Sequence, residues 1–527
     1  MRWVEHADDP GPPADLAGGD TWPEAAPVRN IADLLLNGLP GRPVYVVDNQ
    51  RVSLSDVRAI AARVASALAA GGIRAGARVL LRLPDSPELA GSMLAIFSLG
   101  AIAIPTFMQY GSEEIRYRVV DADVSAVLVE RPSADIVREA VGSLSVAVLV
   151  MDPGGRGAID GYPDEAPVLC PVDTHTDDLA LILYTSGSTG HPKGTCHTHA
   201  DLLAVCNAYG AACLGLGNTD VIVGAAAMPF ALGFALFFLY PLRFGCLAVL
   251  DADKSANRCL ELVKHHRPTL IVGVATYYAM LLRRLEDGTV PDLSGLRGCL
   301  TGGERVTETL AQSWRRQTGM VLTQFLGTTE MLGCFIGSSP GAGVTPSAIG
   351  PPVHGYEVVV RDPETFEPVS DGDHGVLTVR GPTSTKYWRR LEKQCEAVRR
   401  GWNVVPDVVF MKDGLVHFVD RQGDMIKSAG FRVSPTQVEE VLERHQAVSE
   451  CACVGARDPE GIRPEIIKAF IVLRRTYLAT DELKAELQAF VKSRAAPYLY
   501  PRVVEFVASL PRTASGKLQR SALRARL

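Results

Sequence analysis

Residues 184–194 read YTSGSTGHPKG, a run that combines hydroxyl side chains, glycines and one lysine. The strand-like stretch ALILYT (180–185) leads into it. Glycines let backbone N–H groups turn inward, and the hydroxyls and the lysine add donors and a mobile positive charge. Such a segment can hold a polyphosphate. Its candidate phosphate-binding residues are Thr185, Ser186, Gly187, Ser188, Thr189, Gly190 and Lys193.

Two other interpretations of this segment are a P-loop and a flexible surface loop. A P-loop has the pattern G-x-x-x-x-G-K-[ST], in which the residue after the lysine holds magnesium. Here Gly194 follows Lys193 and Pro192 precedes it, so the P-loop pattern is not met. A serine- and glycine-rich stretch with one lysine is, taken alone, most often a flexible surface loop. The segment by itself leaves a phosphate site and a surface loop both open.

Three further stretches follow in the chain: FLGTTEM (325–331), the run from VPD to EEVL (405–442), and LPRTASGKLQR (510–520). Together with residues 184–194, and in this order, they resemble the motifs of the adenylate-forming superfamily. This superfamily includes acyl-CoA synthetases, peptide-synthetase adenylation domains and luciferases. The run His197-Thr198-His199 and the stretch YWRRLEK (387–393) resemble in particular the benzoate- and 2-aminobenzoate-CoA ligases. The two histidines do not have the spacing of a metal site.

The resemblance implies an AMP-forming acid–thiol ligase that uses ATP, Mg²⁺ and CoA. A carboxylate attacks the α-phosphate of ATP, which gives acyl-AMP and pyrophosphate, and a thiol then displaces AMP. Catalysis of this kind depends on positioning and on stabilisation of charge, without a protein nucleophile. Two alternatives stay open: an enzyme that loads the phosphopantetheine of a separate carrier protein, and a non-catalytic ligand-binding relative.

The resemblance also implies roles for single residues. Lys193 assists the departing pyrophosphate, Thr329 contacts the α-phosphate, and Glu330 holds Mg²⁺, which suits one carboxylate with phosphate oxygens. Lys517 is the expected catalyst of the first step. Asp407 binds the ribose, although Val405 and Pro406 stand where relatives have Thr and Gly. The other nucleotide-binding residues are Gly303, Glu304, Gly327, Thr328 and Arg421.

The same resemblance places an acyl pocket around six residues: Phe230, Ala231, Leu232, Gly302, Gly327 and Gly333. Relatives that take benzoate usually have Ala at 302 and His at 333, and often Tyr at 232. Each difference in this chain removes side-chain volume or polarity. We therefore expect a pocket larger and more apolar than benzoate needs, suited to a substituted aryl, polycyclic or branched alicyclic acid.

Elements that position these residues follow from hydrophobic periodicity. Short apolar runs at 78–84, 125–131 and 146–152 alternate with helical patterns such as 56–72, which predicts βαβ units and a mainly parallel sheet. Alternating strands after residue 350 predict a β-rich subdomain, and a smaller α+β unit follows. The fold class is therefore α/β. The resemblance implies a large multi-sheet N-terminal domain and a small mobile α+β C-terminal domain.

Domain boundaries are predicted as a loose arm at 1–28, an adenylate-forming core at 29–421 and a mobile C-terminal domain at 422–527. The reaction's two steps imply two arrangements of the small domain, with a hinge at Gly423, where many relatives have Asp. Lys427 and Gly430 would reach the thiol tunnel in the second arrangement.

Composition excludes several classes of function. A net charge of −6 and a pI near 6.0 argue against general nucleic-acid binding. The uncharged run 221–242 is interrupted by Pro229, Gly233 and Pro241, which favours a buried helix beside an apolar cavity over a membrane span. Eleven scattered cysteines indicate reduced, mostly buried thiols and a cytoplasmic protein. The oligomeric state, a homodimer included, and the direction of the pathway stay open.

Overall fold

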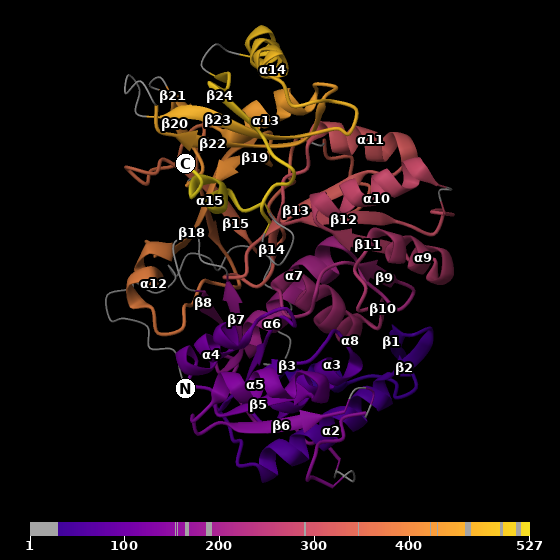
Figure 1. Ribbon diagram of the computed structural model, residues 1–527. Coiled ribbons are helices and arrows are strands. Elements are labelled where there is room, and N and C mark those ends of the chain that lie inside the picture. Colours follow the sequence, from indigo (N-terminus) through magenta and orange to yellow (C-terminus); the bar gives the residue numbers. More distant parts are fainter. Residues whose placement is uncertain are drawn as a thin grey trace.

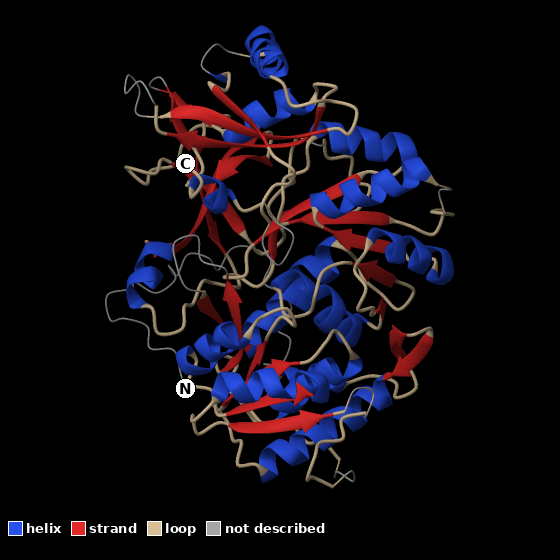
Figure 2. Ribbon diagram, in the orientation of Figure 1, coloured by secondary structure: helices blue, strands red, loops and turns tan. Residues whose placement is uncertain are grey.

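The computed structural model describes residues 30–152, 154, 156–163, 168–185, 192–288, 291–345, 347–421, 423–428, 431–458, 465–495, 499–512 and 518–527. Helices and strands alternate up to residue 337, and strands dominate the segment that follows (Figures 1 and 2). The α/β class and the division into a large N-terminal and a smaller C-terminal domain are confirmed.

The first sheet has six strands in the order β6-β5-β3-β4-β7-β8. Neighbouring strands run parallel except β7 and β8, which form an antiparallel pair. The strands expected at 78–84, 125–131 and 146–152 are confirmed. The elements of this unit are β3 (Arg78–Arg82), β4 (Ile102–Pro105), β5 (Ala126–Glu130), β6 (Ala147–Met151), β7 (Leu179–Thr185), β8 (Lys193–Thr198), α2 (Leu54–Ala70), α3 (Pro87–Ser98), α4 (Ser112–Asp121) and α5 (Ala134–Val141).

The second sheet has eight strands in the order β14-β13-β12-β11-β9-β10-β1-β2. Because β11, β12 and β13 run parallel, the residues that follow them meet at one edge of the sheet. The elements of this unit are β1 (Pro43–Val47), β2 (Gln50–Ser53), β9 (Val221–Gly224), β10 (Leu247–Val249), β11 (Leu270–Gly273), β12 (Gly298–Gly302), β13 (Leu322–Gly327), β14 (Cys334–Gly337), α9 (Ala256–His266), α10 (Ala275–Asp287) and α11 (Glu308–Thr318).

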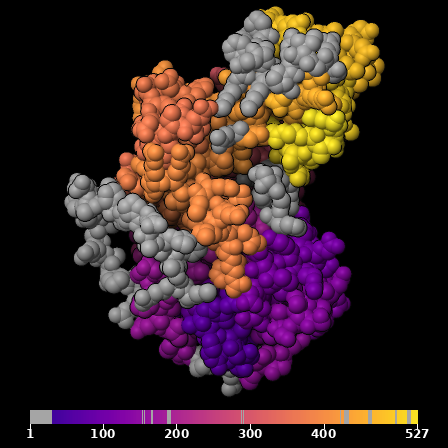
Figure 3. Space-filling model, turned by 90° about the vertical axis from the view of Figure 1, so that its left-hand side faces the viewer, coloured from indigo at the N-terminus to yellow at the C-terminus, as the bar shows by residue number. Residues whose placement is uncertain are grey.

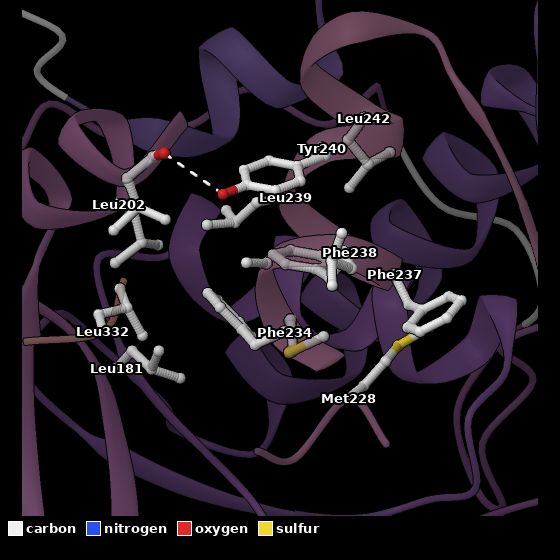
Figure 4. Close-up of a cluster of buried hydrophobic side chains, with 14 of the residues drawn as sticks. Leu181, Leu202, Met228, Phe234, Phe237, Phe238, Leu239, Tyr240, Leu242 and Leu332 are labelled. Atoms are coloured by element: carbon white, nitrogen blue, oxygen red, sulfur yellow. Dashed lines mark hydrogen bonds between the residues drawn. The ribbon is translucent and has the colours of Figure 1, made fainter. Parts of the chain in front are cut away.

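A common apolar layer joins the two sheets. One core cluster contains Leu181 from β7 and Val272 from β11. The rings of Phe234 and Phe238 belong to the same cluster, and Figure 4 shows them with Leu181. Much of the uncharged run 221–242 lies in this layer, so the expected buried helix is confirmed, and none of the described helices is long and apolar enough to cross a membrane. The elements are α1 (Ile31–Leu36), α6 (His199–Val205), the π-helices η3 (Cys206–Cys213) and η4 (Ala235–Leu239), α7 (Ala231–Phe234) and α8 (Tyr240–Phe244).

A five-stranded antiparallel sheet forms the β-rich subdomain expected after residue 350. Figure 3 shows its orange residues beside the yellow C-terminal ones, with the indigo and purple N-terminal residues below. The elements are β15 (Glu357–Arg361), β16 (Gly375–Arg380), α12 (Leu391–Ala397), β17 (Val398–Arg399), β18 (Trp402–Lys412) and β19 (Leu415–Arg421).

The small α+β unit contains a three-stranded sheet and a two-stranded one. Thr480 caps its long helix as the sequence indicates, because its side chain accepts the N–H of Leu483. All eleven cysteines of the chain are free, and most are buried. The elements are β20 (Ile426–Ser428), β21 (Phe431–Val433), α13 (Pro435–Glu443), β22 (Val448–Ala456), β23 (Ile466–Leu473), α14 (Asp481–Arg494), β24 (Val503–Phe506) and α15 (Arg520–Arg524).

Polar contacts tie this small unit to the segment between β12 and α11 and to helix α10. Arg305 pairs with Glu440 at 2.6 Å. Arg512 pairs with Glu450 at 2.9 Å and donates to the Thr276 hydroxyl at 2.9 Å. These contacts hold one arrangement of the small unit. The boundary at residue 422 stays a prediction, since Gln422 lies outside the described residues.

Glu443, at the C-terminal end of α13, makes stability depend on pH. Burial and the neighbouring carboxylates of Glu439 and Glu440 raise its pKa from 4.5 to about 7. The folded state therefore keeps a proton that the unfolded state loses above pH 4.5. We expect the free energy of unfolding to fall by up to about 3 kcal/mol as pH rises from 4.5 to 7, and to level off above that.

Replacing Glu443 by glutamine should remove this part of the pH dependence and raise stability at pH 8. Thermal unfolding of both proteins between pH 5 and pH 8 checks the expectation. Equal pH profiles for the two proteins would contradict it.

Candidate active site

The phosphate-binding segment connects β7 to β8. Thr185 and Lys193 are direct partners in this antiparallel pair, so the two ends of the segment lie side by side. The strand before the segment, which the sequence predicts, is confirmed. The intervening candidates Ser186, Gly187, Ser188, Thr189 and Gly190 lie outside the described residues.

Tyr387, the first residue of the YWRRLEK stretch, has no role predicted from the sequence and stands beside Lys193. Residues 386–388 run along β8, where Cys196 donates to the Lys386 carbonyl at 2.7 Å and Trp388 donates to the Gly194 carbonyl at 2.8 Å. This pairing places the ring of Tyr387 4.8 Å from the Lys193 ammonium. The Tyr387 hydroxyl donates to Glu330 Oε1 at 3.1 Å. Lys193 and Glu330, which come from different sheets, thus contact one aromatic side chain.

Thr329 and Glu330 belong to a tight turn that follows β13. The turn passes so close to Gly327 that a Cβ there would lie 2.3 Å from the Gly333 carbonyl oxygen, so only glycine fits. Inside the turn, Met331 donates to the Thr328 hydroxyl at 3.3 Å. The turn holds Glu330 at the sheet edge, half-buried, with its Oε1 toward Tyr387.

Glu304, predicted to bind nucleotide, is held by a helix. It follows Gly303, whose φ is +80°, and its Oε2 accepts the N–H of Thr276 at the start of α10 at 2.8 Å. Its Oε1 is buried and has no hydrogen-bond partner among the described residues. The Glu304 carboxylate therefore connects the end of β12 to the start of α10. Nucleotide binding by Gly303 and Glu304 stays a prediction.

Asp407 and Arg421 lie opposite each other on β18 and β19. Arg421 Nε is 3.6 Å from Asp407 Oδ1, and Asp407 is buried. The pairing of β18 with β16 is irregular at Pro406 and Asp407, where a proline is tolerated because it does not need to donate a hydrogen bond to the ladder. The hairpin thus brings together Asp407, predicted to bind the ribose, and Arg421, predicted to bind the nucleotide, despite the changed sequence before Asp407.

Two glycines of the predicted acyl pocket lie against side chains for which the sequence predicted no role. A Cβ on Gly302 would lie 2.3 Å from a ring carbon of Phe325, its cross-strand partner. A Cβ on Gly333 would lie 2.9 Å from a methyl group of Val205. The place that a Cβ would take at each of these glycines is therefore next to Phe325 or Val205, and the expectation of a pocket larger than benzoate needs stays a prediction.

Phe230, Ala231 and Leu232 stand at the start of α7 and are half-buried. Their position is fixed by Asp85, which accepts the N–H of Met228 at 3.0 Å and pairs with Lys254 at 3.0 Å. The three side chains lie at the end of the apolar segment that is otherwise buried. Their assignment to the acyl pocket stays a prediction.

His197 and His199 are buried, and burial lowers the pKa of both to about 4, so both are neutral near pH 7. His199 Nδ1 accepts the N–H of Ile31 at 3.2 Å, which is a structural role. No group of three or more His, Cys, Asp or Glu side chains that could hold a metal ion occurs among the described residues.

Four predicted residues belong to the C-terminal part. Lys517 and Gly430 lie outside the described residues, and Lys427 is on β20. Gly423 is exposed, and a Cβ there would meet no heavy atom within 4 Å, so its surroundings allow a side chain. The hinge role of Gly423 stays a prediction.

Comparison with known proteins decides the family. The AMP-binding enzyme family matches residues 36–388, and the AMP-binding enzyme C-terminal domain matches residues 437–517. The chain belongs to the AMP-binding enzyme family. It is 33% identical to a benzoate–CoA ligase of Thauera aromatica over 500 residues, which are 93% of this chain and 94% of that ligase.

Solved structures agree with this membership. The anthranilate CoA ligase AuaEII in complex with anthranoyl-AMP has a TM-score of 0.86 and 30% identity, with 94% of this chain and 97% of that chain covered. A benzoate CoA ligase from Burkholderia xenovorans LB400 has a TM-score of 0.84 and 32% identity, with 94% and 99% covered. The chain is thus an AMP-forming acyl-CoA synthetase, which uses ATP and CoA.

Proposed function

We propose that this synthetase activates an aryl carboxylic acid with one substituted ring, using ATP and Mg²⁺, and transfers the acyl group to CoA. The observation that carries the class of acid is an aromatic pair next to Gly302. The rings of Tyr209 and Phe325 lie 5.5 Å apart, and Phe325 fills the space that Gly302 leaves. Aromatic side chains at this position favour an aryl acid, and the contact of the Phe325 ring with Gly302 favours a single flat ring over a polycyclic or branched acid.

The relatives support the same class. Benzoate–CoA ligase, 3-hydroxybenzoate–CoA ligase and an anthranilate CoA ligase all resemble this chain along more than nine tenths of its length. Long-chain-fatty-acid–CoA ligase of Bacillus subtilis also resembles it, at 28% identity. The aromatic pair of Tyr209 and Phe325 favours an aryl acid over a flexible fatty acid as the substrate.

Each candidate residue has a proposed part in adenylation. Lys193 binds the pyrophosphate portion of ATP, Asp407 accepts the ribose hydroxyls, and Arg421 stands next to Asp407. Lys517 stabilises the charge that develops between the carboxylate and the α-phosphate. Fixed charges of this kind act where charge appears in the transition state and need no reorganisation.

The surroundings of Glu330 fit Mg²⁺. Its Oε1 accepts from Tyr387, whereas its Oε2 has no hydrogen-bond partner among the described residues. One protein carboxylate combined with phosphate oxygens and water is the usual donor set for Mg²⁺ at nucleotide sites. Glu330 would hold the ion, which would supply positive charge at the phosphates.

Phe325 provides a direct test of the acid's size. We expect Phe325→Ala to shift the ratio of kcat/KM for a two-ring acid over a one-ring acid upward by at least about 10-fold, because removing apolar volume from a pocket changes selectivity on this scale. Phe325→Leu should give a smaller shift. Initial rates of AMP release with benzoate and with naphthoate measure the ratio, and an unchanged ratio in both variants would contradict the proposal.

The activity itself is tested by incubating the protein with ATP, Mg²⁺ and a panel of aryl, alicyclic and fatty acids, with and without CoA. Mass spectrometry follows acyl-AMP and acyl-CoA. The proposal expects acyl-CoA from a substituted benzoate. Acyl-AMP that accumulates in the presence of CoA would instead favour a carrier protein as the acceptor, and failure to form either product would favour a non-catalytic relative.

The free, mostly buried cysteines support our further proposal of a cytoplasmic location.

A further inference from the structure

Tyr387 connects the two charged side chains of the phosphate site. Its hydroxyl donates to Glu330 Oε1 at 3.1 Å, and its ring faces the Lys193 ammonium, whose nitrogen is 4.8 Å from the ring centroid. Glu330 follows β13 of the eight-stranded sheet, whereas Lys193 begins β8 of the six-stranded sheet. One side chain thus reaches functional groups carried by two separate sheets.

The backbone of Tyr387 is firmly held. Tyr387 forms an isolated bridge with Thr195, and its own N–H donates to Gln394 Oε1 at 2.9 Å. Gln394 in turn donates to the Thr385 carbonyl at 2.8 Å. The side chain is only 6% exposed. Because the segment is anchored on both sides and the ring is packed, the hydroxyl is presented to Glu330 from a fixed point.

We propose that Tyr387 is a positioning residue of the adenylation site: its hydroxyl orients the Glu330 carboxylate for Mg²⁺, and its ring holds the Lys193 ammonium toward the phosphates. The inference rests on the proposed roles of Glu330 and Lys193. A hydrogen bond to Oε1 fixes the plane of the carboxylate and leaves Oε2 for the ion. Partners of this kind commonly change metal affinity by about 10–100-fold when removed.

Two variants test the role of the Tyr387 hydroxyl and the role of its ring separately. Tyr387→Phe removes the hydroxyl and keeps the ring under Lys193, whereas Tyr387→Leu removes both. Calorimetric titration of ATP in the absence of any acid, repeated over a range of Mg²⁺ concentrations, gives the Mg²⁺ concentration at which ATP affinity is half-maximal. We expect Tyr387→Phe to raise that concentration by about 10–100-fold with little effect on ATP affinity at saturating Mg²⁺. Tyr387→Leu should also weaken ATP binding at saturating Mg²⁺.

Tyr356→Phe is the matched control. Tyr356 is also buried, and its hydroxyl is hydrogen-bonded to Thr383 at 2.9 Å within the β-rich subdomain. The Tyr356→Phe variant also loses a tyrosine hydroxyl, but away from the proposed site. The Mg²⁺ dependence of its ATP binding should therefore equal that of the unmodified protein. Thermal unfolding of all variants accompanies the titrations and reports any general loss of stability.

Glu330→Gln distinguishes a failure of this inference from a failure of the proposed function. If Tyr387 acts through Glu330, the double variant Glu330→Gln/Tyr387→Phe should need no more Mg²⁺ than Glu330→Gln alone. An unchanged Mg²⁺ dependence in Tyr387→Phe, while Glu330→Gln shifts it, would overturn the role of Tyr387 alone. An unchanged dependence in Glu330→Gln would overturn the role of Glu330, and the inference with it.

Discussion

Replacing Lys517 by alanine is expected to slow acyl-AMP formation by about 10²–10³-fold, the usual cost of losing one group that stabilises charge in a transition state. Lys517 lies outside the described residues, so the expectation rests on the stretch PRTASGKLQR and on family membership. The arginines of this stretch on either side of Lys517 are both held: Arg512 by Glu450 and Arg520 by Glu439. Release of pyrophosphate under saturating ATP and acid measures the first step.

The second step provides the control for Lys517. When acyl-AMP and CoA are supplied directly, Lys517→Ala should form acyl-CoA within a few-fold of the normal rate, because the first step is bypassed. Lys517→Arg keeps the charge but not the compact shape of the ammonium, so an intermediate rate is expected. An equal loss in both steps would show that the lysine supports folding or domain contacts and is not specific to adenylation.

Replacing Arg520 by alanine is expected to destabilise the C-terminal unit by about 3–5 kcal/mol, the cost of leaving a buried charge without its partner. Arg520 Nη2 contacts both oxygens of Glu439, at 2.8 and 2.7 Å. Glu439 is buried on α13 and also accepts the N–H of Cys453 at 2.6 Å. Without Arg520, the Glu439 carboxylate would stay in the core of the unit with no opposite charge beside it.

Amide hydrogen exchange of the full chain measures this effect where it occurs. Protection of β22 and β23 should fall in Arg520→Ala while that of the six-stranded sheet stays unchanged. The double variant Glu439→Leu/Arg520→Leu removes both charges and should recover most of the protection. If the double variant does not recover the protection of β22 and β23, lost packing and not the unpaired charge explains the reduced protection in Arg520→Ala.

The sequence alone determined the order of the motifs and the kind of chemistry. Hydrophobic periodicity is local, so strands such as β3, β5 and β6 and the helix α2 follow from short windows of residues. The phosphate-binding segment is recognisable from its glycines and hydroxyls together with the three motifs that follow it in the family's order. Asp407 and Arg421 are found through the resemblance of the stretch 405–442 to the family, and the structure places them opposite each other on one hairpin.

The tertiary structure alone decided how distant segments meet. Gly302 indicates that a side chain is missing, but only the pairing of β12 with β13 shows that Phe325 fills the space. Tyr387 reaches Lys193 and Glu330 because residues 386–388 run along β8, a pairing that no local pattern encodes. Periodicity reports which face of an element is buried, whereas the partner that buries it depends on the whole chain's packing.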